Sequence, residues 1–411
     1  MDYFILFVTF LPALGLLLTF GFGLVVKLNV PAAEIKKDFS YEPKVSVLLP
    51  VYNEGAHVLE TINSILRCNY PPEKLNIIAF DDCSSDDSFA YIQQAERENP
   101  TRVQAFKNPT NAGKHHSLSN ASKKADGDIL ICIDSDCIFH TEVIRELVSC
   151  FAESNIGAVG GRVGVSNPNE NIITQCQSFV YYFSFNIIKA FENLHRNVVC
   201  ISGCMFAVRQ ELFKEIEPAM TARNWFGIGV RDGEDRYMTH LLVLKGYKTY
   251  INNDAQCWTS VPNNLKQLFM QQLRWRRSGL RDLFWTLRHF SSHTKIMSPL
   301  RTTHLIAPAV ISTIWILIIP FSLVGTATLE MRISSLACWM LVFCMMAIAY
   351  NFWTGIKNPE QKIDSPLLLP LICLWMIVNT FFITALALFT FDVGTWGTRE
   401  SVVTNIGQTN A

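Results

Sequence analysis

Two acids that could hold a divalent cation occur in this chain together with a separate acid that could act as a base. Asp134 and Asp136 flank a serine after an apolar run, and Asp235 lies much further along the chain. A cation held by carboxylates can stabilise an anionic leaving group, while a desolvated aspartate can deprotonate an attacking hydroxyl. Five motifs in a fixed order carry the candidate residues: Asp82, Asp134-Ser135-Asp136, Ser202-Gly203-Cys204, Gly233-Glu234-Asp235-Arg236 and Gln271-x-x-Arg274-Trp275.

Apolar runs precede these acids and predict the strands that position them. The predicted strands are Val45 to Pro50, Leu75 to Phe80, Val103 to Phe106 and Ile129 to Ile133. Helical patterns alternate with them: Ala56 to Arg67, Ser85 to Glu98 with Ser84 or Ser85 as N-cap, and Lys114 to Ala125. This alternation indicates an α/β domain with a parallel sheet covered on both faces, whose ligands bind beyond the carboxyl ends of the strands. Those ends read Tyr52-Asn53-Glu54, Asp81-Asp82 and Asp134-Ser135-Asp136.

The Asp134-x-Asp136 pair is interpreted as a metal site beside a diphosphate. Carboxylate oxygens favour Mg²⁺ or Mn²⁺, and the alternative is a solvated surface turn. For Asp235 the alternative to a base is an acid at the start of a helix from Tyr237 to Lys245. The chain has no G-x-G-x-x-G after its first strand and no G-x-x-x-x-G-K-[ST], so dinucleotide and P-loop sites are not indicated.

The composition is too apolar for a soluble enzyme. The 411 residues are 49% hydrophobic, with a mean hydropathy of +0.20. Most of the charge lies between residues 40 and 290, which indicates one soluble domain. A net charge of zero argues against a nucleic-acid partner. Four uncharged stretches are each long enough to cross a bilayer: Leu6 to Val26, Leu305 to Leu329, Ile333 to Ile356 and Pro366 to Phe391.

The first apolar stretch is interpreted as an uncleaved anchor, with a cleaved signal peptide as the alternative. It follows Asp2 and lacks a basic leading segment, which a signal peptide needs. Lys27, Lys36, Lys37 and Lys44 come directly after it, so the positive-inside rule predicts that the soluble domain is cytosolic.

An amphipathic basic helix is predicted from Asn264 to Phe290. Its leucine and phenylalanine residues repeat at helical spacing, with arginines between them, which is typical of a helix at a membrane surface. Within it, Arg274 could bind a diphosphate with its guanidinium fork, and Trp275 could stack on a sugar ring.

Taken together, these motifs resemble the inverting family 2 glycosyltransferases of GT-A fold, in their processive membrane branch. That branch includes cellulose, chitin and hyaluronan synthases and the rhizobial chitin-oligosaccharide synthase. The resemblance covers residues 44 to 277 and is carried by Pro50-Val51-Tyr52-Asn53-Glu54, Asp81-Asp82, Asn111-Ala112-Gly113-Lys114, the D-x-D, Gly233-Glu234-Asp235 and Gln271-x-x-Arg274-Trp275. Trp396-Gly397-Thr398-Arg399 is more similar to hyaluronan and chitin synthases than to cellulose synthases.

The resemblance implies a role for each matching residue. Tyr52 packs on uracil, Glu54 and Asp82 bond the nucleoside, and Lys114 approaches the diphosphate or donor sugar. Asp136 with Asp134 holds Mn²⁺ or Mg²⁺, and Asp235 is the base. Gln271, Arg274, Trp275 and Arg399 complete the UDP-sugar site, and Trp396 and Arg399 gate it. Ser202, Gly203, Cys204 and Trp275 line the acceptor site. Cys204 stands where hyaluronan synthases have proline, which leaves the acceptor sugar open.

Hydropathy and resemblance conflict over residues 366–391. A full span would put Trp396 and Arg399 opposite the cytosolic site, whereas the resembling synthases keep this motif inside. We therefore expect a re-entrant or interfacial segment. The expected organisation is a transmembrane helix at 1–28, a cytosolic GT-A domain at 40–260, amphipathic interfacial helices at 261–300, two transmembrane helices at 303–356, the re-entrant or interfacial segment at 366–392 and a tail with the gating motif at 393–411.

The function expected from the resemblance is a processive inverting β-glycosyltransferase of the plasma membrane. It would use UDP-N-acetylglucosamine to elongate and export a hyaluronan- or chitin-type polysaccharide, with UDP-glucuronic acid open as a second donor. Its partners would be the UDP-sugar, the growing polymer and membrane lipid, with no obligate protein partner. The alternatives are a non-processive enzyme that loads a lipid carrier and a catalytically silent membrane scaffold or transporter.

Overall fold

The computed structural model describes residues 35–193, 196–225, 228–230, 232–297 and 379–390, together with the single positions Ile306, Val310, Glu330, Leu371, Leu374 and Trp375. No helix among these residues combines the length and apolar character needed to cross a bilayer. The stretches Leu6 to Val26, Leu305 to Leu329 and Ile333 to Ile356 lie outside the described ranges except for Ile306 and Val310.

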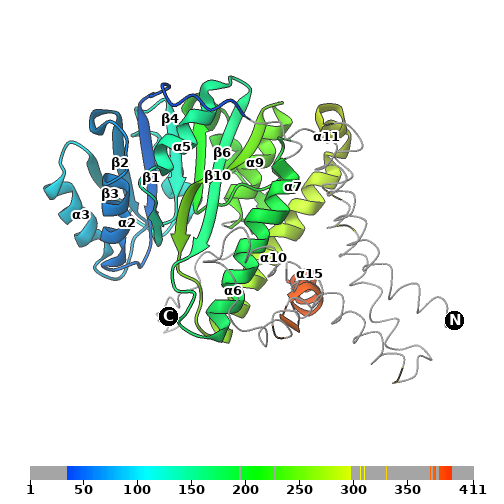
Figure 1. Cartoon of the computed structure of the whole chain (residues 1–411). Coiled ribbons are helices and arrows are strands. Elements are labelled where there is room, and N and C mark those ends of the chain that lie inside the picture. Colours follow the sequence, from blue (N-terminus) through cyan, green and yellow to red (C-terminus); the bar gives the residue numbers. More distant parts are fainter. Residues whose placement is uncertain are drawn as a thin grey trace, which may run out of the picture.

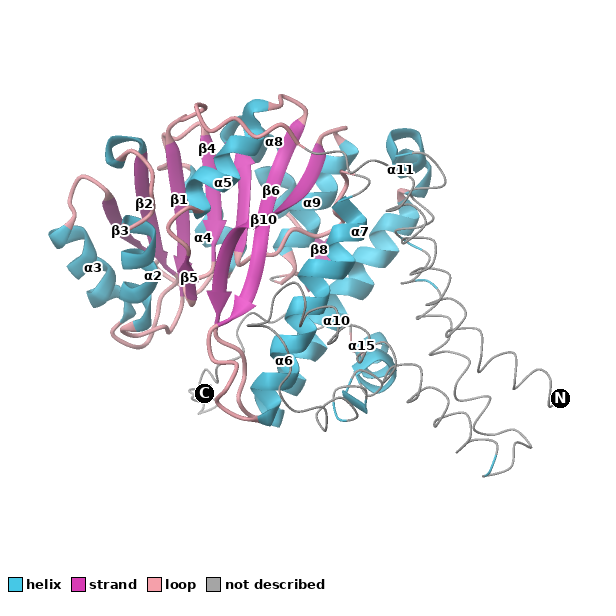
Figure 2. Ribbon diagram, viewed as in Figure 1, coloured by secondary structure: helices cyan, strands magenta, loops and turns pink. Residues whose placement is uncertain are grey.

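An eight-stranded sheet forms the centre of the molecule (Figures 1 and 2). Its order is β3-β2-β1-β4-β7-β6-β10-β5. The strands are β1 Val45–Val51, β2 Leu75–Asp81, β3 Val103–Lys107, β4 Ile129–Ile133, β5 Cys137–Phe139, β6 Ile156–Val165, β7 Met205–Arg209 and β10 Lys248–Thr259. A separate two-stranded ribbon pairs β8 Asn224–Trp225 with β9 Ile228–Gly229.

The helices connect and cover these strands. In chain order they are α2 His57–Leu66, α3 Ser88–Glu98, α4 Lys114–Ser122, α5 Val143–Ser149, α6 Ile172–Phe183, α7 Lys189–Asn193, α8 Gln210–Thr221, α9 Glu234–Leu244, α10 Leu265–Arg288, α11 Phe290–Met297 and α15 Thr384–Phe389. Shorter turns are the 3₁₀ segments η1 Pro72–Lys74 and η2 Cys150–Ala152 and the π-helical segments η3 Ser184–Ile188 and η5 Asn379–Ile383.

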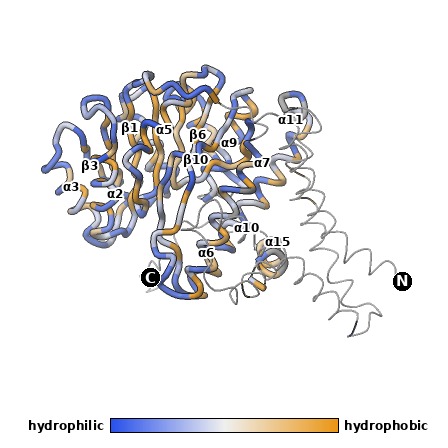
Figure 3. Tube along the Cα trace, viewed as in Figure 1, coloured by the Kyte–Doolittle hydropathy of each residue, from blue (hydrophilic) through white to orange (hydrophobic). Residues whose placement is uncertain are grey.

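The apolar core lies on both faces of the sheet. Alternate side chains of β1 point to opposite faces, so Val47 and Leu49 join a cluster under α2 and α5, whereas Leu48 joins a cluster under α4, α8 and α9. Apolar residues follow the central strands and polar residues the outer loops (Figure 3). This two-sided burial explains why the strands are continuous apolar runs in the sequence.

The sheet is mixed, where the sequence predicted a mostly parallel one. Strands β3, β2, β1 and β4 are parallel as predicted, but β7 runs antiparallel to both β4 and β6, and β5 runs antiparallel to β10. Strand β7 begins at the edge of the sheet where β4 and β6 end, and it therefore runs in the direction opposite to both. The Ser202-Gly203-Cys204 turn before β7 therefore lies at the same edge as the Asp134-Ser135-Asp136 loop.

The predicted N-cap of the second helix was wrong. Helix α3 begins at Ser88, after Asp87, rather than at Ser84 or Ser85. The hydroxyl of Ser84 accepts a hydrogen bond from the Asn53 amide at 3.0 Å instead, and the Ser88 hydroxyl accepts from the Glu54 amide at 2.9 Å. These serines hold the loop after β1, which carries the predicted nucleoside-binding residues.

Candidate active site

The Asp134-Ser135-Asp136 loop and the Ser202-Gly203-Cys204 turn meet because β4 and β7 pair in an antiparallel register. Ile133, the last residue of β4, is paired with Met205, the first residue of β7. Helix α2 also fixes this loop, because the Thr61 hydroxyl donates to the Ser135 carbonyl at 2.8 Å. The D-x-D acids and the predicted acceptor turn therefore face each other at the carboxyl edge of β4.

Lys114 joins the D-x-D loop to the motif around Asp235. It is the first residue of α4, and its Nζ lies 2.6 Å from Asp134 Oδ1 and 2.8 Å from Glu234 Oε1. Burial lowers the pKa of Lys114, but the charges of Asp134, Glu234 and Asp235 outweigh burial and raise this pKa well above its ordinary value. The ammonium group is thus a fixed positive charge inside the site.

Asp235 lies in the first turn of α9, beside the acceptor turn. Its Oδ2 accepts from the Gly203 amide at 3.0 Å, and its Oδ1 accepts from the Arg236 amide at 2.8 Å. Burial and the neighbouring Glu234 charge raise the pKa of Asp235, although Lys114 and Arg236 oppose this shift. A raised pKa makes a carboxylate a stronger base, which suits proton abstraction from a hydroxyl.

A glycine lies at the centre of the acceptor turn, close to Lys114. A Cβ on Gly203 would lie 2.7 Å from Lys114 Nζ and 3.5 Å from Asp235 Oδ2. The close approach of this backbone lets the Gly203 amide bond Asp235 while Lys114 lies beside it. The glycine predicted to line the acceptor site therefore also positions the predicted base.

Asp82 holds the loop that ends in Lys114. The side chain is fully buried, its Oδ1 accepts from Asn108 Nδ2 at 2.8 Å and from the Ala112 amide at 3.1 Å, and its Oδ2 accepts from the Gly113 amide at 2.7 Å. These bonds orient the N-terminus of α4. The sequence did not predict this positioning role, and the contact of Asp82 with a nucleoside stays a prediction, as do those of Tyr52 and Glu54 on the loop after the neighbouring strand β1.

Helix α10 presents the Gln271-x-x-Arg274-Trp275 residues to the same region. Among the described residues, buried Gln271 Oε1 and buried Arg274 Nε have no hydrogen-bond partner. Trp275 is 40% exposed, and its ring centroid lies 6.3 Å from that of Tyr181 on α6. Buried polar atoms without partners are rare in folded proteins, so Gln271 and Arg274 each keep a polar atom to which water or a ligand can bind.

Buried polar contacts and ion pairs join α10 to α9 and to the residues just before it, and sequence reasoning did not find them. Asp282 Oδ1 lies 2.8 Å from His240 Nε2, and Asp282 Oδ2 lies 3.7 Å from Arg236 Nη1. Arg281 forms a second pair with Asp232, just before α9, and both side chains are 2% exposed. Charged residues on polar helices look like ordinary surface charges in the sequence, so only the packing identifies these contacts.

Two predicted residues lie outside the part of the chain that the structure describes, and one residue beside Trp275 was not predicted. Trp396 and Arg399, predicted to gate the site, lie outside the described residues. Tyr181 was missed, because an aromatic residue in an apolar helix reads as core. The structure brings Lys114, Asp134, Gly203 and Asp235 together, along with Glu234, which the sequence placed in a motif without a role.

The comparison with family models agrees with this geometry. The model described as "Glycosyltransferase like family 2" matches residues 43–278, more than half of the chain. The chain belongs to this family of glycosyltransferases. The match begins just before β1 and ends within α10, so it contains every described site residue.

Curated relatives of this glycosyltransferase include the hyaluronan synthase of Streptococcus pyogenes. It is 25% identical over 399 residues, which cover 93% of this chain and 92% of the relative. The N-acetylglucosaminyltransferase of Rhizobium meliloti (strain 1021) is 29% identical over 246 residues, or 60% of this chain and 58% of the relative. These two names agree with the resemblance expected from the motifs.

A solved structure supports the GT-A fold. The mannosyltransferase PcManGT from Pyrobaculum calidifontis, in complex with GDP-Man and Mn²⁺, aligns with a TM-score of 0.56 at 17% identity. The alignment covers 90% of this chain and 98% of that chain. At this identity the likeness concerns the fold, a GT-A-like α/β domain with a mixed sheet.

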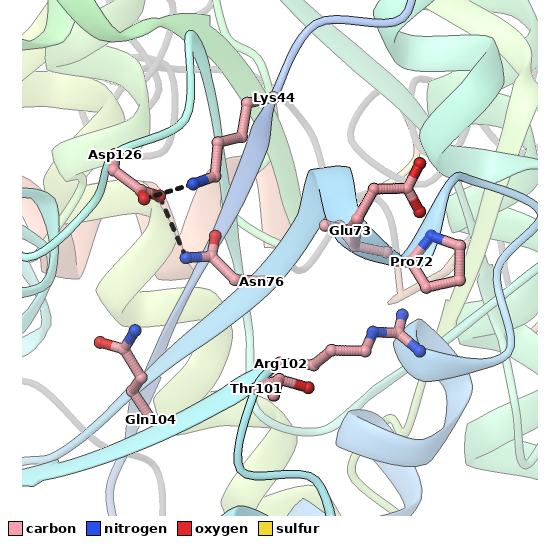
Figure 4. Close-up of a pocket in the computed structure, with 9 residues that line it drawn as sticks. Lys44, Pro72, Glu73, Asn76, Thr101, Arg102, Gln104 and Asp126 are labelled. Carbon is pink, nitrogen blue, oxygen red and sulfur yellow. Dashed lines mark hydrogen bonds and ion pairs between the residues drawn. The ribbon is translucent and has the colours of Figure 1, made fainter.

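A separate polar groove lies at the opposite, amino edge of the sheet of this glycosyltransferase (Figure 4). Lys44, Asn76, Arg102 and Asp126 line it, and Lys44 and Asn76 both bond Asp126. The Nε and Nη2 atoms of Arg102 lack partners among the described residues but are buried beneath the groove surface. None of the predicted site residues lines this groove, so it is not the catalytic site.

Proposed function

We propose that this glycosyltransferase is a processive inverting β-glycosyltransferase that uses UDP-N-acetylglucosamine. It elongates and exports a hyaluronan- or chitin-type polysaccharide at the plasma membrane, with its catalytic domain in the cytosol. The observation that carries the proposal is the contact between Asp235 Oδ2 and the Gly203 amide at 3.0 Å. It supports the proposal because the carboxylate of Asp235, whose pKa is raised, is bonded to the turn assigned to the acceptor, on the strand next to the D-x-D loop.

The base step follows from this contact. An inverting transfer needs one base that removes the proton of the acceptor hydroxyl on the face opposite the leaving group. Asp235 accepts that proton, and the Gly203 amide holds its carboxylate in place. The positive charge of Lys114, paired with Asp134 and Glu234, stabilises negative charge near the D-x-D loop.

The donor set of the D-x-D loop fits a divalent cation. The described residues contain no cluster of three or more His, Cys, Asp or Glu side chains that could enclose a metal. Asp134 and Asp136 supply two carboxylates, and Mg²⁺ or Mn²⁺ bound by few carboxylates completes its shell with water and substrate phosphates. Asp136, with Asp134 beside it, would hold the cation, which supplies positive charge to the departing diphosphate.

The remaining donor contacts are assigned from the motifs. Gln271 and Arg274 each have a buried polar atom without a partner among the described residues, and guanidinium suits a diphosphate. Tyr52, Glu54 and Asp82 follow β1 and β2 at the same edge of the sheet and are assigned to the nucleoside. Trp396 and Arg399 are assigned to gating.

An exposed apolar surface along α10 and α15 supports contact with lipid. Leu265, Phe284 and Leu287 of α10 are 63%, 45% and 42% exposed, and Phe389 at the end of α15 is 85% exposed. Helix α10 is basic, and large exposed apolar side chains on a basic helix are typical of a membrane surface. Export of a polymer through the membrane requires the site to lie against lipid, as this surface allows.

Product digestion tests the proposal. Purified full-length protein in lipid vesicles receives UDP-N-acetylglucosamine alone or with UDP-glucuronic acid, and the product is treated with chitinase or hyaluronidase. We expect UDP release in proportion to a polymer that one of the two enzymes degrades. A product that carries a single sugar and extracts into organic solvent would instead identify a lipid-carrier transferase.

A metal-removal experiment tests the D-x-D assignment. We expect no turnover in EDTA, recovery with Mn²⁺ or Mg²⁺, and loss of metal-dependent UDP binding in Asp136→Ala. Asp254→Ala, which removes a largely exposed carboxylate paired with Lys37, is the matched control. Full activity in EDTA would contradict the metal role.

A further inference from the structure

Tyr181 of α6 forms a corner with Trp275 at the acceptor side of the site. The two ring centroids lie 6.3 Å apart at an interplanar angle of 54°, and Phe185 extends the aromatic surface, 6.5 Å from Tyr181. Helix α6 begins at a capping box in which the Asn171 side chain accepts from the Ile173 and Thr174 amides. A firmly capped helix gives Tyr181 a defined position.

The order of the strands places Tyr181 on the acceptor side rather than the nucleotide side. At the carboxyl edge of the sheet, Asp82 follows β2, Tyr52 follows β1 and the D-x-D loop follows β4. On the other side of the D-x-D loop come the Gly203 turn before β7 and then β6, which leads into α6. The residues assigned to the nucleotide therefore lie on one side of the D-x-D loop, and those assigned to the acceptor lie on the other side.

The hydroxyl of Tyr181 is available to a ligand. It takes part in no hydrogen bond among the described residues, although the ring is half-buried against the core. Tyr70 offers a comparison within the chain, because its buried ring accompanies a hydroxyl that donates to the Pro43 carbonyl at 2.6 Å. Tyr181 differs in that its hydroxyl is not among the buried polar atoms of the described residues that lack a partner, so solvent or a ligand can reach it.

Tyr181 packs against the same core cluster as Cys204 of the acceptor turn. A sugar bound beside that turn would offer an oxygen to the hydroxyl of Tyr181.

We infer that Tyr181 binds the acceptor. Its ring and that of Trp275 form the two walls against which the terminal pyranose of the growing chain lies, and its hydroxyl donates to an oxygen of that sugar. The inference rests on the proposed function, because it takes the transferase acceptor to be a saccharide. It adds a specificity residue that no motif of the chain contains.

Oligosaccharide binding separates this role from a structural one. The probes are a β-1,4-linked N-acetylglucosamine tetrasaccharide and a hyaluronan tetrasaccharide, titrated by calorimetry into the full chain in detergent with saturating UDP and Mn²⁺. We expect Tyr181→Phe to weaken binding of one probe by roughly 2- to 10-fold, which corresponds to one net hydrogen bond. Tyr181→Leu, which also removes the ring, should weaken it further. Both variants should leave UDP affinity unchanged.

Tyr91→Phe is the control, since it removes a hydroxyl from α3 at the other end of the sheet. Unchanged tetrasaccharide binding in Tyr181→Phe, equal loss of UDP and tetrasaccharide affinity, or failure of the parent protein to bind either probe would each overturn the inference. A different result would contradict the proposed function alone: the parent protein would bind a probe, with the expected effect of Tyr181→Phe, but would make no polymer from UDP-sugars.

Discussion

Lys114 and Asp235 illustrate how single residues of the site depend on one another. Lys114 forms ion pairs with Asp134 and Glu234, and the Gly203 backbone lies close to both Lys114 and Asp235. The charge of Glu234 raises the pKa of Asp235, whereas the charge of Lys114 lowers it. The pKa of Asp235 is therefore influenced in opposite directions by Glu234, which precedes it on α9, and by Lys114 on α4.

Asp235→Asn should abolish transfer while preserving the donor site. The amide oxygen of asparagine can still accept from Gly203, but it cannot remove a proton. We expect turnover to fall by roughly 10²- to 10⁴-fold and UDP affinity to stay within about threefold. UDP release and calorimetric UDP binding measure the two quantities. Asp254→Asn is the control at an exposed aspartate, and sustained polymer synthesis by Asp235→Asn would exclude the base assignment.

The pH profile of turnover should report the raised pKa of Asp235. A base works only when deprotonated, so activity should be lost as the pH falls through a pKa above the ordinary aspartate value of 3.8. Glu234→Gln removes a negative neighbour, which lowers the pKa of Asp235 and moves the acid limb of kcat/KM to lower pH. Glu215→Gln, at an exposed pair with Lys245, should leave the limb in place. A shift to higher pH in Glu234→Gln would refute this electrostatic account.

At the scale of elements, the site depends on how α9 and α10 pack. Buried pairs between Asp282 and His240 and between Arg281 and Asp232 join the helix that carries Asp235 to the helix that carries Arg274 and Trp275. Gly233, the N-cap of α9, lies against Ser278 of α10: its φ is +71°, and a Cβ would collide with the Ser278 hydroxyl.

Gly233→Ala should therefore cost both stability and activity. A left-handed φ alone costs about 1–2 kcal/mol for a residue with a Cβ, and the collision with Ser278 would push α9 away from α10. Gly246→Ala is the matched control, because Gly246 has φ +88° and a Cβ added there would meet no atom of the described residues within 4 Å. The midpoint temperature of thermal unfolding and the rate of UDP release should both fall in Gly233→Ala, whereas Gly246→Ala should lower only the midpoint temperature. Equal rates of UDP release in the two variants would show that the spacing of α9 and α10 does not affect activity.

At the scale of the whole molecule, the described C-terminal segment packs on α10. Asn379 accepts from Arg276 Nε at 3.1 Å and donates to Gln272 Oε1 at 2.6 Å, while Thr390 accepts from Arg277 Nε at 3.0 Å. The end of the apolar stretch from Pro366 to Phe391 thus lies beside the helix that carries Trp275. The re-entrant or interfacial character of residues 366–392 stays a prediction.

A cysteine at Thr404 tests this topology. In a background without reactive native cysteines, we expect impermeant maleimide to label Thr404→Cys only when the face that exposes the catalytic domain is open. Glu98→Cys on the exposed end of α3 marks that face. Labelling of Thr404→Cys from the opposite face of sealed vesicles would make residues 366–391 a true span and remove the gating role proposed for Trp396 and Arg399.

The sequence by itself determined the α/β class, the first four parallel strands and the edge at which the acids gather. Local signals carry this information, since continuous apolar runs and the acids that follow them are adjacent in the chain. The antiparallel strand β7, the junction of Lys114 with Glu234 and the aromatic corner of Tyr181 and Trp275 were decided only by the tertiary structure. Each depends on segments far apart in the sequence, whose contact is set by strand order and by the packing of α9 on α10 rather than by local pattern.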